Sequence, residues 1–131
     1  MERIPGSHRD LLMAQFATLA TVGASGRPQQ SVIWFLAEGD DIRISLSSGR
    51  QKTVNLQKNP ACSLLILDPS NSFRYLEVRG QAKVTTDEDY VFATKVGAKY
   101  GADLRQYDAP GEARLIVTIV PERVRAVDMS G

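Results

Sequence analysis

The residues of this chain that are best suited to chemistry lie in one short segment, Ser-Leu-Ser-Ser-Gly-Arg-Gln-Lys-Thr at positions 45–53. Its serine hydroxyls and the Gly49 backbone can donate hydrogen bonds, and Arg50 and Lys52 add two full positive charges. Arginine binds a phosphate through two parallel hydrogen bonds, whereas lysine acts as a point charge. Because the start of a helix also exposes free N–H groups that favour an anion, the segment predicts a site for a phosphate-type anion where a helix begins at residue 50.

Charge around this segment is one-sided. Residues 42–67 contain no acid, and their basic side chains are Arg43, Arg50, Lys52 and Lys58. A helix face that is merely solvated usually includes acids that pair with bases four residues away. A solvated basic face is the alternative interpretation, and the missing countercharge favours the anion site.

A candidate surface for a flat ring precedes the anion segment. In the predicted strand 29–36, Gln29 and Ser31 lie on the opposite face from Gln30, so one face offers polar groups while Val32 and Trp34 pack nearby. The alternative is that residues 32–35 belong only to the core or to an interface, and the pattern is compatible with both.

Composition excludes several classes of function. The 131 residues carry a formal net charge of +1, whereas proteins that grip nucleic acid or anionic lipid usually carry a larger imbalance. With one cysteine, Cys62, and one histidine, His8, the chain lacks the ligands for a metal cluster and the pairs for Cys/His catalysis. No apolar run is long enough for a membrane helix, and residues 1–10 do not resemble a signal peptide. We therefore expect a cytoplasmic protein without metal, nucleic-acid or membrane partners, built as a single domain over residues 1–131.

The elements that must position these residues are mostly strands. Alternation and turn signals predict strands at 17–22, 29–36 and 42–46 that form an antiparallel meander, with a hairpin loop at 23–28. Further predicted strands cover 61–67, 73–84 with a bulge at Gly80, 113–120 and 123–127. Helices are expected at 10–16, at 50–58 with a serine cap, and at 85–100, where Thr85 and Glu88 have the spacing of a capping box. This order predicts a mainly β (α+β) fold, a small antiparallel barrel that closes to hide its edges.

Several of these segments together resemble the split-barrel flavin and deazaflavin oxidoreductases, the superfamily of pyridoxamine 5′-phosphate oxidase. The resemblance covers most of the chain and rests on residues 17–22, on Gly-Arg-Pro-Gln at 26–29, on residues 42–48, and on Arg-Gln-Lys-Thr-Val-Asn-Leu-Gln-Lys-Asn-Pro at 50–60. Within the superfamily, the chain most resembles the short branch that uses coenzyme F420. The resemblance implies an FMN-binding type of split β-barrel with six or seven antiparallel strands and short helices, and a homodimer with two cofactor sites at the subunit interface.

The resemblance also implies which residues bind the cofactor. The phosphate would be held by Ser47, Ser48, Arg50 and Lys52. The tricyclic ring would lie by Gln29, Ser31 and Val32, and the set of cofactor-binding residues also includes Thr53 and Lys58.

The implied reaction is that of an F420-dependent reductase, which transfers a hydride to an electrophilic carbon of a conjugated small molecule such as an enone or a lactone. The resemblance identifies no catalytic residue, and Tyr75 and Ser31 are the candidates for donating a proton afterwards. Residues 123–131 lack the Arg-Leu-x-Pro ending of the long pyridoxamine phosphate oxidases, so a different substrate is expected.

Two alternatives remain open on the same fold. One is an FMN-binding oxidoreductase, and the other is a carrier that binds F420 or a flavin without catalysis. A cofactor with an oligoglutamate tail needs basic groups beyond its phosphate, whereas FMN ends at its phosphate. The residues that would discriminate between the two cofactors are therefore Lys58, Arg43 and Arg27.

Overall fold

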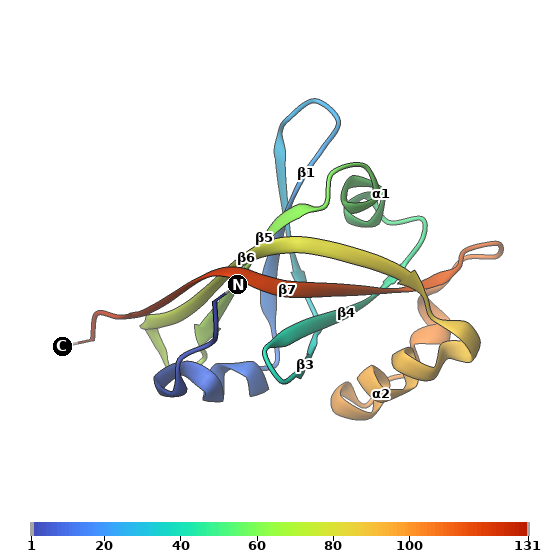
Figure 1. Cartoon of the computed structure of the whole chain (residues 1–131). Coiled ribbons are helices and arrows are strands. Elements are labelled where there is room, and N and C mark those ends of the chain that lie inside the picture. Colours follow the sequence, from blue (N-terminus) through green and yellow to red (C-terminus); the bar gives the residue numbers. More distant parts are fainter. Residues whose placement is uncertain (1, 131) are drawn as a thin grey trace.

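The computed structural model describes residues 2–130, and most of these residues lie in strands (Figure 1). Within them, seven strands occur: β1 (Ala17–Val22), β2 (Pro28–Ile33), β3 (Leu36–Glu38), β4 (Asp41–Ser47), β5 (Ala61–Asp68), β6 (Asn71–Thr86) and β7 (Arg114–Asp128). The α-helices are α1 (Gln51–Lys58) and α2 (Val91–Tyr100). Short 3₁₀ helices are η1 (Gly6–Met13), η2 (Glu88–Tyr90) and η3 (Leu104–Tyr107).

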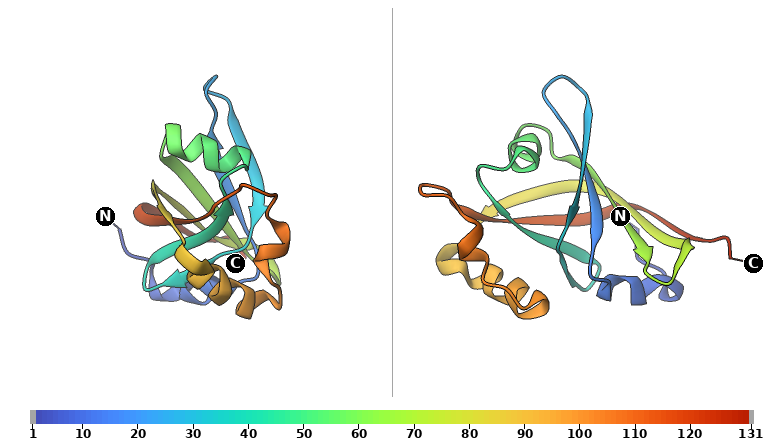
Figure 2. Two further views of the ribbon diagram at one scale, coloured as in Figure 1. Left: turned by 90° about the vertical axis from the view of Figure 1, so that its right-hand side faces the viewer. Right: turned by 180° about the vertical axis from the view of Figure 1, so that it is seen from behind.

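The strands form one antiparallel sheet in the order β2-β1-β5-β6-β7-β4-β3. β2 and β3 are the two edges of this sheet, yet only Trp34 and Phe35 separate them in the chain. Two intervening residues span roughly 11 Å at most, whereas a flat sheet of this order would place its edges roughly 29 Å apart. The sheet must therefore curl until its edges approach each other, as the crossing strands in Figures 1 and 2 show.

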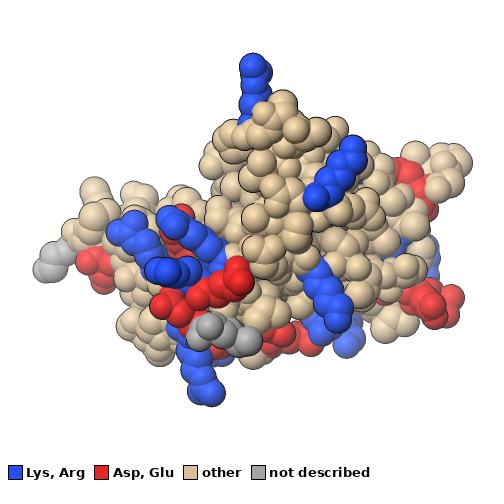
Figure 3. Space-filling model, turned by 45° about the horizontal axis from the view of Figure 1, so that its top comes forward, with Lys and Arg blue, Asp and Glu red and all other residues tan. Residues whose placement is uncertain are grey.

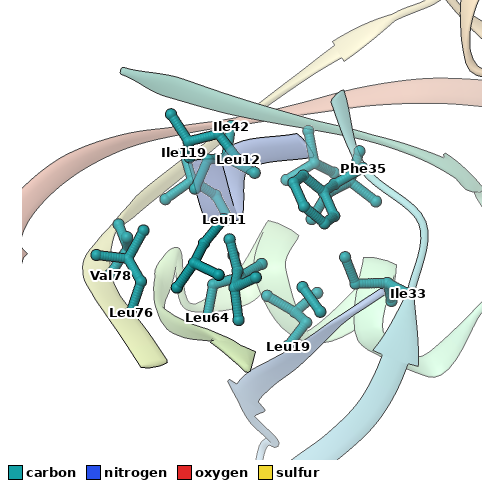
Figure 4. Packing of buried hydrophobic residues seen from close by; sticks show 14 of the residues in the cluster. Leu11, Leu12, Leu19, Ile33, Phe35, Ile42, Leu64, Leu76, Val78 and Ile119 are labelled. Carbon is teal, nitrogen blue, oxygen red and sulfur yellow. The ribbon is translucent and has the colours of Figure 1, made fainter. Parts of the chain in front are cut away.

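The inside of the curl is filled with apolar side chains. Figure 4 shows residues of η1 and of strands from both halves of the sheet pointing toward one another. Leu64 and Ile66 alternate along β5 and are completely buried, and Leu11 and Leu12 of η1 cover the interior from one side. Burial of a Leu or Ile side chain contributes about 1.5–3 kcal/mol, so this cluster is the main source of stability for the curled sheet.

A second, smaller apolar cluster lies between the sheet and α2. Phe92 and Val96 of α2 pack with Leu104 of η3, and the partly buried Trp34 and Ile116 pack against them. Figure 1 shows α2 and its adjoining short helices at the end of the sheet away from the β1–β2 hairpin. This cluster forms one wall of the cavity described below.

The prediction of a mainly β, antiparallel split-barrel fold is confirmed, with seven strands. The predicted strand at 17–22 coincides with β1, and α1 ends before Asn59 and Pro60 as expected. The predicted irregularity at Gly80 is a register shift against β7, where Glu122 is the extra residue. A Cβ atom at position 80 would collide with the Val120 carbonyl, so the close approach of the two strands requires glycine there.

The prediction for three segments is wrong. Residues 29–36 are not one strand in a meander, because β2 ends at Ile33 and β3 continues on the opposite edge of the sheet. The two predicted C-terminal strands are the single strand β7, since the bulge at Glu122 accommodates Pro121, which has no N–H to donate. The helix expected at 10–16 is instead the 3₁₀ helix η1, which begins directly after Pro5.

Both predicted helix caps are also wrong. β6 continues to Thr86, so Thr85 lies in a strand, and the Asp87 carboxylate instead accepts hydrogen bonds from the N–H groups of Phe92 and Ala93 at 3.0 and 2.8 Å. No serine caps α1. The residue before its first turn is Arg50, whose side chain makes no capping hydrogen bond.

Candidate functional site

A cavity of about 290 Å³ lies between β2, β4 and the region of α2 and η3, next to the first turn of α1. Its lining has a basic part, formed by Ser47, Arg50 and Lys52, and an apolar part that α2 and η3 supply. The remaining lining residues are Val32, Ile33, Trp34, Ile44, Ser45, Leu46, Val96, Leu104, Tyr107 and Arg114. An anionic group and a flat apolar ring can both be accommodated by such a combination.

Lys52 is positioned in the basic part by the edge strand β2. Its Nζ atom donates a hydrogen bond to Ser31 Oγ at 3.1 Å. Burial lowers the pKa of the Lys52 amine, and the neighbouring Arg50 charge lowers it further. An incoming anion would offset both effects, because it favours the charged form of the amine. Within residues 2–130 neither the exposed Arg50 nor Lys52 forms a direct ion pair.

Residues 47–53 include three hydroxyls from the predicted cofactor-binding set, those of Ser47 and Ser48, expected at the phosphate, and that of Thr53, and their protons are used differently. Thr53 is fully buried, and its Oγ1 donates to the Ser47 carbonyl at 2.8 Å. Ser48 Oγ accepts from the Ala113 N–H at 2.9 Å, which leaves its own proton free. Ser47 Oγ donates to a carboxylate oxygen of Glu112 at 2.6 Å. Only the Ser48 hydroxyl therefore has an uncommitted proton.

Of the residues expected beside the ring, Val32 lines the cavity and Gln29 does not. Val32 lines the cavity, and 67% of its surface is exposed. Gln29 instead belongs to a polar network, in which its Oε1 accepts from Thr21 Oγ1 at 3.2 Å and from Asn55 Nδ2 at 3.3 Å. This network joins α1 to β1 and β2. Gln29 therefore stabilises the packing of the elements around the cavity and does not line it.

The basic residues considered for a cofactor tail are separated from one another. Lys58 is exposed in the last turn of α1, roughly 12 Å along the helix axis from Arg50. Arg43 pairs with Glu38 at 3.5 Å across β3 and β4, and Arg27 is exposed in the turn before β2. Of the predicted site residues, the structure brings into the cavity Val32, Ser47, Arg50 and Lys52, with Ser31 bonded to Lys52.

Arg114 also lines the cavity, although the sequence did not identify it. Its buried side chain forms an ion pair with Asp108, and its Nη2 donates to the Leu104 carbonyl at 3.0 Å. A buried charge requires a partner, which Asp108 provides here. In the sequence, the only indication of a buried arginine is its position at the start of the apolar strand β7. Asp108 gave no signal of its own in a polar loop.

An aromatic group closes the apolar part of the cavity. Trp34 stacks on Tyr100 with ring centroids 4.4 Å apart, and Tyr107 meets Trp34 edge-on at 6.4 Å. The sequence places Trp34 near the site but gives no sign of Tyr107, which comes from a different segment of the chain.

The charge distribution is consistent with a small ligand. Figure 3 shows one face of the molecule, on which Lys and Arg side chains stand singly over α1 and the β1–β2 hairpin. No group of three His, Cys, Asp or Glu residues that could hold a metal ion occurs among residues 2–130. Over the same residues, none of the helices combines the length and apolarity needed to span a membrane.

The single cysteine, Cys62, and the candidate proton donor Tyr75 both lie outside the cavity. Burial raises the pKa of the Cys62 thiol to about 11, and the Glu122 charge contributes, so the thiol is not a nucleophile at neutral pH. Tyr75 pairs with Val127, at the opposite end of β7 from Arg114, roughly 40 Å along the strand. Within one chain, Tyr75 therefore lies far from the basic residues of this cavity.

Comparison with known proteins agrees with this architecture. The family model described as pyridoxamine 5′-phosphate oxidase matches residues 4–128. Among solved structures, the chain is similar to an F420 reductase, with 32% identity and a TM-score of 0.83 over 93% of this chain and 98% of that one. It also has the fold of a conserved hypothetical protein from Mycobacterium tuberculosis, with 22% identity and a TM-score of 0.78 over 98% and 90% of the two chains. No curated protein matches the chain. The extent of the family match, over the strands that build the cavity, shows that this chain belongs to the pyridoxamine 5′-phosphate oxidase family.

Proposed function

We propose that this chain is an F420-dependent reductase that transfers a hydride from the reduced deazaflavin to an electrophilic carbon of a conjugated small molecule, such as an enone or a lactone. The observation that carries the proposal is that Arg50 and Lys52 line one cavity together with a wall of aromatic and aliphatic side chains. Membership of the family indicates an oxidoreductase with a flavin-type cofactor. Similarity to an F420 reductase at 32% identity favours the deazaflavin over FMN.

The residues of the cavity fit a tricyclic cofactor that carries a phosphate. Arg50 and Lys52 supply charge. Ser48 does not line the cavity, but its free proton offers a donor in the same segment. Val32 and Ile33 of β2 offer an apolar surface to the ring. Lys58 lies further along α1, where it can meet the negative tail that distinguishes F420 from FMN.

The chemistry demands little of the protein beyond position and environment. When bound, the reduced cofactor supplies a hydride to the β-carbon of the conjugated acceptor, and a proton from solvent then completes the saturated product. Trp34, Leu104 and Tyr107 limit access of water to the apolar part of the cavity. Arg50 and Lys52 fix the cofactor by its phosphate and so orient its ring relative to the acceptor.

We further propose that the active form is a homodimer with shared cofactor sites. The cavity, at about 290 Å³, is at the lower limit of ligand pockets, which are typically about 300–1,000 Å³. Val32 and Tyr107 line it yet are 67% and 60% exposed. A second copy of the chain would cover these apolar side chains and complete the pocket.

Purified protein titrated with F420 and with FMN tests the cofactor, since Trp34 is the single tryptophan and lines the cavity. We expect tighter binding of F420 and, with the reduced form, turnover of conjugated enones or lactones. Tighter binding of FMN would favour the alternative FMN-dependent oxidoreductase. Tight binding of reduced F420 without oxidation by any acceptor in the panel would favour a carrier.

A further inference from the structure

The Glu112 carboxylate, from a distant part of the chain, contacts Ser47 in the predicted anion site. Glu112 is 65 positions from Ser47 in the sequence, yet its Oε2 accepts the Ser47 hydroxyl proton at 2.6 Å. The same carboxylate lies so close to Gly49 that a Cβ atom at that position would collide with it. The acid-free segment 42–67 therefore receives its countercharge from the turn before β7.

The position of Glu112 is built into the fold. Its Oε1 accepts from the Ala109 N–H at 2.7 Å, and its own N–H donates to the Ala109 carbonyl at 3.1 Å. Two hydrogen bonds between Ser48 and Ala113 fasten the neighbouring backbone, the Ser48 N–H to the Ala113 carbonyl at 2.8 Å and the Ala113 N–H to Ser48 Oγ at 2.9 Å. The contacts with Ala109 and the pairing of the adjacent Ala113 with Ser48 thus fix Glu112 next to the site.

The carboxylate is ionised at neutral pH. The hydrogen bond from Ser47 lowers the pKa of Glu112, and the N–H groups of Ala109 and Gly49 and the charge of Arg50 lower it further. Two of its interactions at this position are of the kind that a bound phosphate would receive: the Ser47 hydroxyl proton and the charge of Arg50.

A phosphate and Glu112 cannot use the same donors at once. Ser47 has one hydroxyl proton, so it can donate to one acceptor only. Two anions beside Arg50 would also repel each other. We infer that Glu112 is an internal anion that occupies the Ser47 hydroxyl proton beside Arg50 in the free chain, and that cofactor binding exchanges this carboxylate for the cofactor phosphate. The inference rests on the proposed function, and it makes Glu112 a residue that sets the affinity for the phosphate.

A comparison of FMN with riboflavin tests this exchange, because the two differ only by the phosphate. The variants are Glu112→Gln, which keeps the shape, and Glu112→Ala, which removes the side chain. Glu88→Gln is the matched control, since it removes one negative charge from an exposed glutamate outside the cavity. We expect Glu112→Gln or Glu112→Ala to bind FMN about tenfold more tightly, with riboflavin binding unchanged and Glu88→Gln like the wild type. F420 is titrated against the same variants, which should likewise bind it more tightly than the wild type. Thermal unfolding verifies that each variant is folded.

The outcomes separate this inference from the proposed function. If the wild type binds FMN or F420 and neither Glu112 variant binds it more tightly, Glu112 does not compete and the inference is overturned. If no form of the protein binds either cofactor but the variants gain affinity for inorganic phosphate, the internal anion stands and the proposed function fails. An equal gain for FMN and riboflavin would also overturn the inference, because the effect would not involve the phosphate.

Discussion

Lys52 and Ser31 are 21 positions apart in the sequence, yet Lys52 Nζ donates a hydrogen bond to Ser31 Oγ at 3.1 Å. This bond joins the first turn of α1 to the edge strand β2. This hydrogen bond therefore connects the segment predicted to bind an anion with the strand predicted to lie beside a ring. An ammonium has three donors, so Lys52 can keep its bond to Ser31 and still donate to a phosphate.

Replacement of Lys52 by methionine should weaken phosphate binding and spare the ring. We expect FMN and F420 to bind about 10–100-fold more weakly, because a hydrogen bond to a charged group contributes about 1.5–3 kcal/mol. Riboflavin, which lacks the phosphate, should bind as it does to the wild type. The measurement is fluorescence titration, with Lys83→Met as a control that removes the charge of an exposed lysine outside the cavity. Equal losses for FMN and riboflavin would show that Lys52 does not contact the phosphate.

The same residue predicts a pH dependence of cofactor binding. The charged amine binds the phosphate, so affinity is complete below the pKa of Lys52 and falls as pH rises through it. Because burial and the Arg50 charge lower the pKa of Lys52, we expect the loss of affinity to begin at lower pH than for an exposed lysine. Titrations between about pH 7 and about pH 10 test this. Lys52→Arg stays charged over this range and should abolish the dependence; an unchanged profile would assign the titration to another group.

Lys58 should distinguish the two cofactors. It lies at the opposite end of α1 from Arg50, exposed to solvent. We expect Lys58→Gln to weaken binding of F420 several-fold, because one charge–charge contact with the tail is lost and solvent screens the remainder. Binding of FMN should not change. Lys83→Gln, an exposed lysine on β6, is the control for the loss of one positive charge. A similar effect of Lys58→Gln on both cofactors would contradict a tail site at the end of α1.

Val32 should be needed for the proposed dimer. It is an exposed apolar side chain that lines the cavity, and a charge there would have to be removed from water when two copies associate. We expect Val32→Glu to shift the protein to the monomer in sedimentation experiments and to weaken cofactor binding. Val91→Glu is the matched control, since Val91 is 61% exposed on α2 and does not line the cavity. A dimer that persists in Val32→Glu would place the interface elsewhere.

The sequence predicts elements well where local pattern determines them. Alternation in residues 17–22 and the Asn-Pro after Lys58 are local signals, and both elements are found where expected. The arrangement of Trp34 and Phe35 is not a local property, because the break between β2 and β3 depends on closure of the whole sheet. A run of apolar residues there is equally compatible with one continuous strand.

The candidate site shows the same division. Arg50 and Lys52 are two positions apart in the sequence and line one cavity as expected, because Arg50 directly precedes α1 and Lys52 lies in its first turn. Glu112 and Arg114 reach the site only through the pairing of β4 with β7, in which Ser47 lies opposite Arg114. No periodicity within residues 42–67 carries information about that partner strand.

The residue that caps the start of α2 can be identified by mutation, because the sequence pattern and the structure name different residues. Thr85 and Glu88 have the spacing of a capping box, but Thr85 lies in β6, and Asp87 accepts the Phe92 and Ala93 N–H groups. Loss of a helix cap costs about 1 kcal/mol, up to about 2 kcal/mol, so Asp87→Ala should lower the free energy of unfolding by that amount in urea titrations. Thr85→Ala, which removes an exposed strand side chain, should cost less than about 0.5 kcal/mol. If Thr85→Ala were the more destabilising of the two, the cap would belong to Thr85 and the start of α2 would have to be reassigned.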